Sequence, residues 1–105
     1  LLGYVVIKNE AVSTSGDYYR FFEEGGVRYH HILNPFTGYP GRDFQAVTVI
    51  SEEAVFADIL STAIMAGGKE ALAVVEKKFP EVKILTIEED KIYLSSSMEK
   101  VFFAE

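Results

Sequence analysis

The chain has 105 residues, a net charge of −6 and no cysteine, with 49% hydrophobic and 25% charged residues. This composition is typical of one globular domain with a modest core, and the lack of thiols excludes disulfides, thiolate metal sites and thiol catalysis. No run or stripe of Lys and Arg is present, which argues against nucleic acid or an anionic membrane surface as a partner.

The first third of the chain is rich in β-branched and aromatic residues, which predicts strands. The predicted strands cover residues 3–8, 11–14, 18–24 and 27–33. Gly25-Gly26 joins the last two, and because primed turns need positive φ, we expect a hairpin there. The polar segment Ser13-Thr14-Ser15-Gly16-Asp17 is expected to form a loop.

Two helices are predicted in the second half. Ser51 is the expected N-cap of the first, with Glu52 and Glu53 in its first turn, and Gly67-Gly68 is its expected end. Helical spacing predicts an inward face made of Val55, Phe56, Ile59, Leu60, Ala63 and Ile64. The second helix is expected over residues 69–79, before a proline.

The order of the elements predicts the fold class. Residues 44–50 alternate as a strand, with Val47 and Val49 on one face and Thr48 and Ile50 on the other. Further strands are expected over residues 82–87, 92–95 and 101–103. Strands, then two helices, then strands indicate a single α+β domain over residues 1–105, a mainly antiparallel sheet with two helices packed on one face.

The beginning of the chain resembles neither a signal peptide nor an initiation site. Leu-Leu-Gly-Tyr-Val-Val-Ile lacks an initiator methionine, a basic region and a cleavage site, and no apolar run is long enough to span a bilayer. We therefore expect a piece of a longer protein. An exposed apolar face where the rest would pack predicts self-association of the isolated piece.

Two adjacent imidazoles end a predicted strand, directly before a turn built from Asn34-Pro35 and Thr37-Gly38. Neighbouring strand residues point to opposite faces, so one reading of His30 and His31 is an exposed ring and a core ring. The other is one imidazole that acts as general base beside a rigid turn, since its pKa lies near neutral pH. Spacing alone leaves both open.

Asp58 and Thr62 lie four residues apart on the first predicted helix, so their side chains share one face. A carboxylate and a hydroxyl there can bind a hard cation such as Mg²⁺, which prefers oxygen ligands. The alternative is a solvated aspartate and a threonine bonded back to its own helix.

The remaining candidates are the polar segment 13–17 and the aromatic residues. The segment either aims N–H groups at a phosphate or forms an ordinary turn, and its glycine spacing matches no nucleotide fingerprint. An acidic chain needs such N–H groups or a metal to attract a phosphate ester. Most aromatics are expected in the core or in cross-strand pairs, and Tyr39 is the best candidate for another role.

Four segments, taken together and in order, resemble the successive motifs of the ApbE family. They are Ser-Thr-Ser-Gly-Asp-Tyr (13–18), His-Ile-Leu-Asn-Pro-Phe-Thr-Gly-Tyr-Pro (31–40), Ala-Val-Thr-Val-Ile (46–50) and Ala-Asp-Ile-Leu-Ser-Thr-Ala (57–63). The family consists of FAD:protein FMN transferases, formerly described as thiamine-biosynthesis lipoproteins. The resemblance covers essentially the whole chain and corresponds to the C-terminal third of a typical member.

The resemblance implies Mg²⁺-dependent transfer of FMN from FAD to a threonine or serine of a target flavoprotein, with release of AMP. His31 would be the general base, and His30 matches a variable position. Asp58 and Thr62 would hold Mg²⁺. Ser15, Gly16 and His31 would line the FAD site.

Two features depart from the family pattern. Asn34 stands where the family has Asp, which removes a negative charge beside His31. The family's N-terminal two-thirds supply much of the FAD pocket, so the remainder of an ApbE-like protein or a partner chain is expected to complete the site.

Two alternative functions stay open, an FAD hydrolase that yields FMN and AMP and a non-catalytic α+β domain that binds a nucleotide or a protein. By resemblance the protein is bacterial and either a periplasmic or membrane-anchored lipoprotein or cytoplasmic.

Overall fold

The computed structural model describes residues 3–16, 20–25, 28–32, 43–88 and 91–104 of the chain. They form a five-stranded antiparallel sheet with strand order β3-β2-β5-β6-β7 and a three-stranded antiparallel sheet with order β4-β1-β8. The strands are β1 (Gly3–Ile7), β2 (Glu10–Gly16), β3 (Arg20–Gly25), β4 (Arg28–Ile32), β5 (Ala46–Ser51), β6 (Lys83–Glu88), β7 (Lys91–Leu94) and β8 (Phe102–Ala104). The helices are α1 (Ala54–Lys78) and α2 (Ser96–Glu99). The predicted α+β class is confirmed, and the second sheet is an addition to it.

The first four strands are the two arms of one long antiparallel hairpin that passes from one sheet to the other. Glu10 pairs with Gly25 in the five-stranded sheet, and Ile7 pairs with Arg28 in the three-stranded sheet. In both sheets the numbers of two paired residues add up to 35, so the two arms keep the same register where they pass from one sheet to the other.

The predicted hairpin at Gly25-Gly26 is therefore wrong. Its two strands, β3 and β4, belong to different sheets, and the hairpin connection lies between Gly16 and Arg20. On the opposite arm, Asn9 lies between β1 and β2 at φ 53°. A glycine pair permits a sharp bend in a strand as readily as a reversal, which is why the sequence signal was misread.

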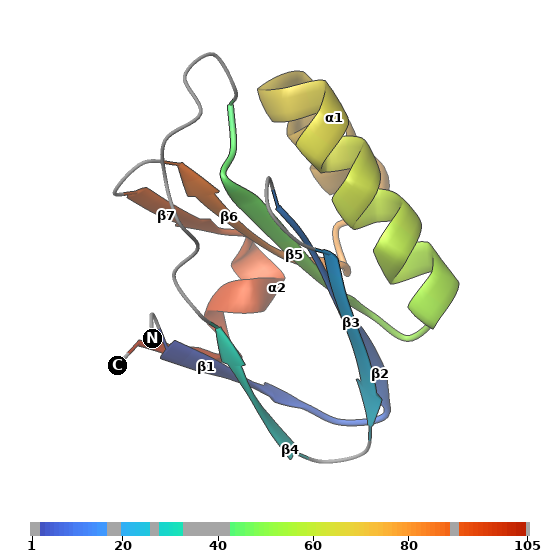
Figure 1. Ribbon diagram of the computed structural model, residues 1–105, viewed down its shortest axis with the longest axis vertical. Coiled ribbons are helices and arrows are strands. Elements are labelled where there is room, and N and C mark those ends of the chain that lie inside the picture. Colours follow the sequence, from blue (N-terminus) through green and yellow to red (C-terminus); the bar gives the residue numbers. More distant parts are fainter. Residues whose placement is uncertain (1–2, 17–19, 26–27, 33–42, 89–90, 105) are drawn as a thin grey trace.

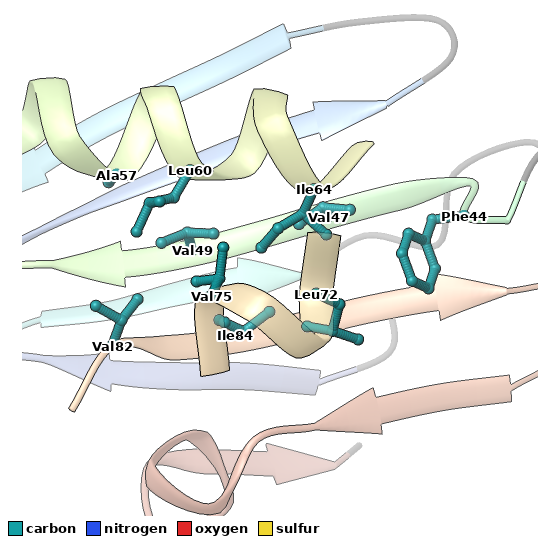
Figure 2. Packing of buried hydrophobic residues seen from close by; sticks show 10 residues of the cluster. All are labelled: Phe44, Val47, Val49, Ala57, Leu60, Ile64, Leu72, Val75, Val82 and Ile84. Atoms are coloured by element: carbon teal, nitrogen blue, oxygen red, sulfur yellow. The ribbon is translucent and has the colours of Figure 1, made fainter. Parts of the chain in front are cut away.

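Two hydrophobic clusters fill the spaces on either side of the five-stranded sheet. Helix α1 covers one face, and the three-stranded sheet lies on the other side, with α2 beside it (Figure 1). The cluster under α1 consists of Phe44, Val47, Val49, Ala57, Leu60, Ile64, Leu72, Val75, Val82 and Ile84 (Figure 2). The cluster on the opposite face consists of Val5, Ile7, Val12, Ala46, Ile50, Leu85, Ile87 and Met98. The predicted alternation of β5 is confirmed, since Val47 and Val49 belong to the first cluster and Ile50 to the second.

Helix α1 consists of two segments that meet at Gly68, where the backbone leaves the helical region at φ 70° and ψ −152°. The predicted break at Gly67-Gly68 is confirmed. The side chain of Asp43 accepts a hydrogen bond from the backbone N–H of Lys69 at 2.9 Å and so caps the second segment. A Cβ at position 68 would lie 2.1 Å from Asp43 Oδ2, so both the backbone angle and the contact require glycine.

The predicted start of the first helix is two residues early. Ser51 is the last residue of β5, and the N-cap position is Glu53. Ser51 Oγ accepts a hydrogen bond from the backbone N–H of Glu53 at 3.4 Å. Glu52 and Glu53 thus precede the helix instead of forming its first turn.

The predicted inward face of the first helix is partly wrong. Its buried residues are Ala57, Leu60, Ser61 and Ile64, whereas Val55 and Ile59 are 72% and 56% exposed. Ala63, predicted inward, is also exposed. Apolar residues occur all round this segment, so periodicity alone does not select one face.

The C-terminal strands β6, β7 and β8 lie close to their predicted ranges, and the short helix α2 was not predicted. The side chain of Ser95 accepts a hydrogen bond from the backbone N–H of Ile84 at 2.9 Å, which fixes the start of α2 against β6. Within the described part of the chain, neither helix has the length and hydropathy needed to cross a bilayer.

Candidate functional site

The candidate metal ligands lie on the first segment of α1. Asp58 is partly buried and Thr62 is exposed, one helical turn further along. The prediction that both lie on one helix at i and i+4 spacing is confirmed, so their side chains share one face.

Strand β2 packs directly under this turn of the helix. Ser13 and Ser15 lie in β2 and not in a loop, so the loop predicted over 13–17 is wrong for 13–16, and Asp17 lies outside the described residues. Ser13 Oγ donates a hydrogen bond to Asp58 Oδ1 at 3.2 Å. Two of the three predicted cofactor residues, Ser15 and Gly16, thus lie in the strand that supports the predicted metal ligand, whereas His31 lies in β4.

Ser61 completes a cluster of buried hydroxyls between α1 and β2. Its Oγ lies 3.0 Å from Ser15 Oγ and 3.2 Å from Ser13 Oγ, and it donates to the backbone carbonyl of Asp58 at 3.1 Å. The sequence reading missed Ser61 because it assigned a loop to 13–17. Extending the strand to Gly16 places positions 11, 13 and 15 on one face, which would have revealed small hydroxyls facing the helix.

Ser15 and Gly16 were expected to line the FAD site. Ser15 is buried, and its hydroxyl contacts Ser61 within the fold. Gly16 ends β2 and pairs with Ala46. The Ser15 side chain therefore faces α1, and Gly16 is the last residue of β2.

The donor atoms of Asp58 and Thr62 suit a hard cation. Magnesium takes oxygen ligands and is commonly held by one or two carboxylates together with waters and substrate phosphates. Within residues 3–16, 43–88 and 91–104, whose side chains are described, no group of three or more His, Cys, Asp or Glu side chains is placed to hold a metal. The pair fits Mg²⁺ by its donor atoms, and further ligands would be needed to complete the coordination shell.

The two histidines occupy neighbouring register positions in β4. His30 pairs with Val5 and His31 with Tyr4. Val5 belongs to the cluster between the sheets, whereas Tyr4 stacks on the exposed Phe103, with ring centroids 5.3 Å apart. Directly paired residues share a face of the sheet, so positions 30 and 31 lie on opposite faces, as predicted.

His31 lies in β4 of the three-stranded sheet, and Asp58 lies on α1, which covers one face of the five-stranded sheet. The side chains of the histidines, and all of Asn34 and Tyr39, fall outside the described part of the chain.

A separate cavity of about 380 Å³ lies at the other end of α1, with Glu76, Phe79 and Ser95 in its wall. Nearby, the Tyr93 hydroxyl donates a hydrogen bond to Glu76. That bond, together with burial and the negative charges of Glu76 and Glu99, raises the pKa of Tyr93 from its ordinary 10.0 to about 12. None of the predicted site residues lines this cavity.

Comparison with known proteins agrees with the motif reading. Residues 1–86 match the sequence profile of the ApbE family. The chain is 42% identical over 88 residues to a FAD:protein FMN transferase from Treponema pallidum (strain Nichols), covering 83% of this chain and 24% of that protein. It is 32% identical over 105 residues to a FAD:protein FMN transferase from Klebsiella pneumoniae (strain 342), covering 99% and 33%.

A solved structure gives the same result. The fold resembles the flavin transferase ApbE from Vibrio cholerae with a TM-score of 0.58 and 35% sequence identity, over 88% of this chain and 30% of that one. The chain thus spans between a quarter and a third of the length of these relatives.

Proposed function

The chain belongs to the ApbE family, and we propose that it is the C-terminal catalytic region of an FAD:protein FMN transferase. The observation that carries the proposal is the position of Asp58 and Thr62. They form an oxygen-donor pair on one helix face, in a chain whose curated relatives are named for flavin transfer. A bound cation would let this acidic chain attract FAD, which is itself an anion.

The reaction is a phosphoryl-group substitution at the pyrophosphate of FAD. The hydroxyl oxygen of a threonine or serine on the target flavoprotein attacks the phosphorus of the FMN half. The new P–O ester bond forms as the pyrophosphate bond to the AMP half breaks. AMP leaves, and the proton of the attacking hydroxyl passes to a base. FAD is the substrate, and the acceptor flavoprotein is the partner.

Each candidate residue has a distinct role in this scheme. Asp58 and Thr62 hold Mg²⁺, which when bound neutralises charge on the pyrophosphate. His31 accepts the hydroxyl proton as general base. Support for Asp58 and Thr62 comes from both motif and geometry, whereas support for His31 comes from the motif alone.

Ser15 and Gly16 support the flavin-nucleotide side of the site from the end of β2. The Ser15 hydroxyl is engaged with Ser61 below the helix. Its contribution is therefore to the shape of the strand end and not to direct recognition of FAD. The remainder of an ApbE-like protein, or a partner chain, supplies the other walls of the site.

The test is a product assay with the intact protein, FAD, Mg²⁺ and an acceptor flavoprotein. We expect the acceptor to gain the mass of one FMN and to become fluorescent in a denaturing gel, with AMP released in equal amount. Omission of the acceptor serves as the control. FMN that appears only in solution, with or without the acceptor, would show an FAD hydrolase and overturn the transferase proposal.

A further inference from the structure

We infer that Ser13, Ser61 and Ser15 form a buried hydrogen-bond relay that positions the carboxylate of Asp58 for metal binding. The inference rests on the proposed function, because it takes Asp58 as a ligand of Mg²⁺. It assigns to the three serines a role that is neither contact with FAD nor contact with the metal.

The contacts reach Asp58 from β2 beneath it and from the next turn of its own helix. Ser13 Oγ contacts the carboxylate at 3.2 Å, and Ser61 Oγ contacts the backbone carbonyl of the same residue at 3.1 Å. Ser13 and Ser61 have no exposed surface, and Ser15 is 6% exposed. Water therefore cannot replace these bonds without a local opening of the fold.

Counting protons restricts the directions in which the relay can run. Three hydroxyls supply three protons, whereas a carboxylate and a carbonyl only accept. Ser13 gives its proton to Asp58, so its contact with Ser61 uses the proton of Ser61. The proton of Ser15 then serves the contact with Ser61. Ser61 shares its single proton between Ser13 and the carbonyl of Asp58.

The relay therefore runs from Ser15 through Ser61 and Ser13 to Asp58. Hydrogen bonds in such a chain polarise one another, which strengthens the last bond onto the carboxylate. One hydroxyl occupies about one of the four acceptor positions of a carboxylate, so the bond is compatible with coordination of a cation. Second-shell partners of this kind fix the orientation of a metal ligand.

Simple packing does not account for these hydroxyls. Among the described residues, the contact between α1 and the sheet is formed largely by apolar side chains such as Leu60, Ile64 and Val49. Alanine would fill nearly the same volume as serine there without a buried polar group to satisfy. A polar cluster in this place, directed at one carboxylate, indicates a role in holding that carboxylate.

The chain contains a matched control on the other face of the same strand. Thr14 Oγ1 lies 2.9 Å from Thr48 Oγ1, and both residues are buried. This pair is also a buried hydroxyl contact between secondary-structure elements, but neither threonine contacts Asp58. Loss of the Thr14 hydroxyl therefore reproduces the structural cost of losing a serine without touching the metal ligand.

The experiment is a titration of the intact protein with Mn²⁺ alone, without FAD, followed by the electron paramagnetic resonance signal of free Mn²⁺. We expect Ser13→Ala to weaken Mn²⁺ binding about 10-fold, in the range found for second-shell changes. Ser61→Ala should have a smaller effect and Ser15→Ala the smallest, in order along the relay. Thr14→Val should lower Tm by a similar amount to Ser13→Ala and leave Mn²⁺ affinity unchanged.

The outcomes separate this inference from the proposed function. Equal loss of Mn²⁺ affinity in Ser13→Ala and Thr14→Val would reduce the serines to a structural role and overturn the relay. Asp58→Ala is the reference for loss of the metal ligand itself. If it abolishes binding while all three serine variants bind normally, the relay is refuted and the metal site stands. If Asp58→Ala binds Mn²⁺ as the wild type does, the metal assignment fails first and the relay with it. Should Ser13→Ala not fold, Ser61→Ala decides the question, since it interrupts the same relay one step earlier.

Discussion

The two segments of α1 pack on the same sheet but differ on the side turned away from it. The first segment, residues 54–67, contains a single charged residue, Asp58, whereas residues 69–78 contain five. The outer side of the first segment exposes Val55 and Ile59, at 72% and 56%. A helix that is apolar all round is typical of a buried helix, and a helix with a charged outer face is typical of a surface.

The polar contacts of the two segments differ in the same way. In the second segment, Lys69 Nζ pairs with Glu88 Oε2 at 3.1 Å, and Glu76 accepts a hydrogen bond from the Tyr93 hydroxyl. The charged side chains of this segment thus form contacts at the protein surface. In the first segment, the polar contacts include the buried serine bonds to Asp58. The comparison shows that the first segment combines one charged residue, Asp58, with an exposed apolar outer side, as expected for a helix face that packs against another surface.

The largest expected effect comes from replacing one carboxylate on each segment with alanine and comparing the two variants. Asp58→Ala should lower FMN transfer by about 10²–10³-fold, because loss of a metal ligand removes several kcal/mol of transition-state stabilisation. Glu70→Ala, on the exposed side of the second segment, should leave transfer unchanged. Initial rates with FAD, Mg²⁺ and an acceptor flavoprotein measure both. Equal rates for the two variants would mean that Asp58 has no catalytic role. That result would contradict both the transferase and the hydrolase hypotheses.

The glycine between the segments is expected to control stability instead of chemistry. Gly68→Ala should cost about 1–3 kcal/mol of unfolding free energy from backbone strain alone, and the contact of the new Cβ with Asp43 adds to this. Urea unfolding followed by circular dichroism measures the change. Gly67 has helical backbone angles, and the new Cβ of Gly67→Ala would lie 2.7 Å from Ala71 Cβ, so this variant measures the cost of a close contact without the backbone strain of position 68. A wild-type unfolding midpoint in Gly68→Ala would mean that the break between the segments is not required.

The exposed apolar residues of the first segment should govern self-association of the 105-residue chain. Val55→Lys with Ile59→Lys should weaken self-association about 10-fold or more, because charge opposes burial of that face. Val74→Lys, at a position 52% exposed on the second segment, is the matched control and should change it little. Sedimentation velocity over a concentration series measures each. A larger effect from Val74→Lys would place the self-association surface on the second segment instead.

The sequence predicted those parts of the fold that depend on local chemistry. The break at Gly67-Gly68 and the alternation of Val47 and Val49 follow from backbone freedom and side-chain period, and both are confirmed. The inward face of the first segment was partly wrong because nearly every residue there is apolar, so burial is decided by tertiary contacts. The hairpin at Gly25-Gly26 was wrong because glycines permit a bend and a reversal equally.

The candidate site was predictable to the extent that it lies within one helix. Asp58 and Thr62 followed from their spacing and from the family motif, and the helix places them as expected. Ser61 was missed because its contacts are with Ser13 and Ser15 of β2, which is distant in sequence and was predicted as a strand only up to residue 14. The relation of His31 to Asp58 depends on how two sheets meet, and no periodicity within either segment contains that information.

The smallest expected effect concerns the charged side of the second segment at alkaline pH. The Tyr93 phenol has a pKa of about 12 in the folded protein, above its ordinary 10.0, chiefly because it donates a hydrogen bond to Glu76. A raised pKa means that the fold favours the protonated form. This contribution to stability is fully present below pH 10 and is lost as the pH rises to about 12, because the unfolded chain ionises first.

Substitutions at both partners of this bond test the point. Tyr93→Phe should be less stable than the wild type by about 0.5–1 kcal/mol near pH 8, as is usual for one exposed hydrogen bond, and the difference should shrink as the pH rises towards 12. Glu76→Gln should also flatten the alkaline decline, because it removes the charge that raises the pKa of the phenol. Urea unfolding at pH 8, 10 and 11.5 measures all three proteins. A gap that widens with pH would reverse the sign of the coupling. It would then place the alkaline sensitivity of the chain elsewhere than at the contact between the second segment and β7.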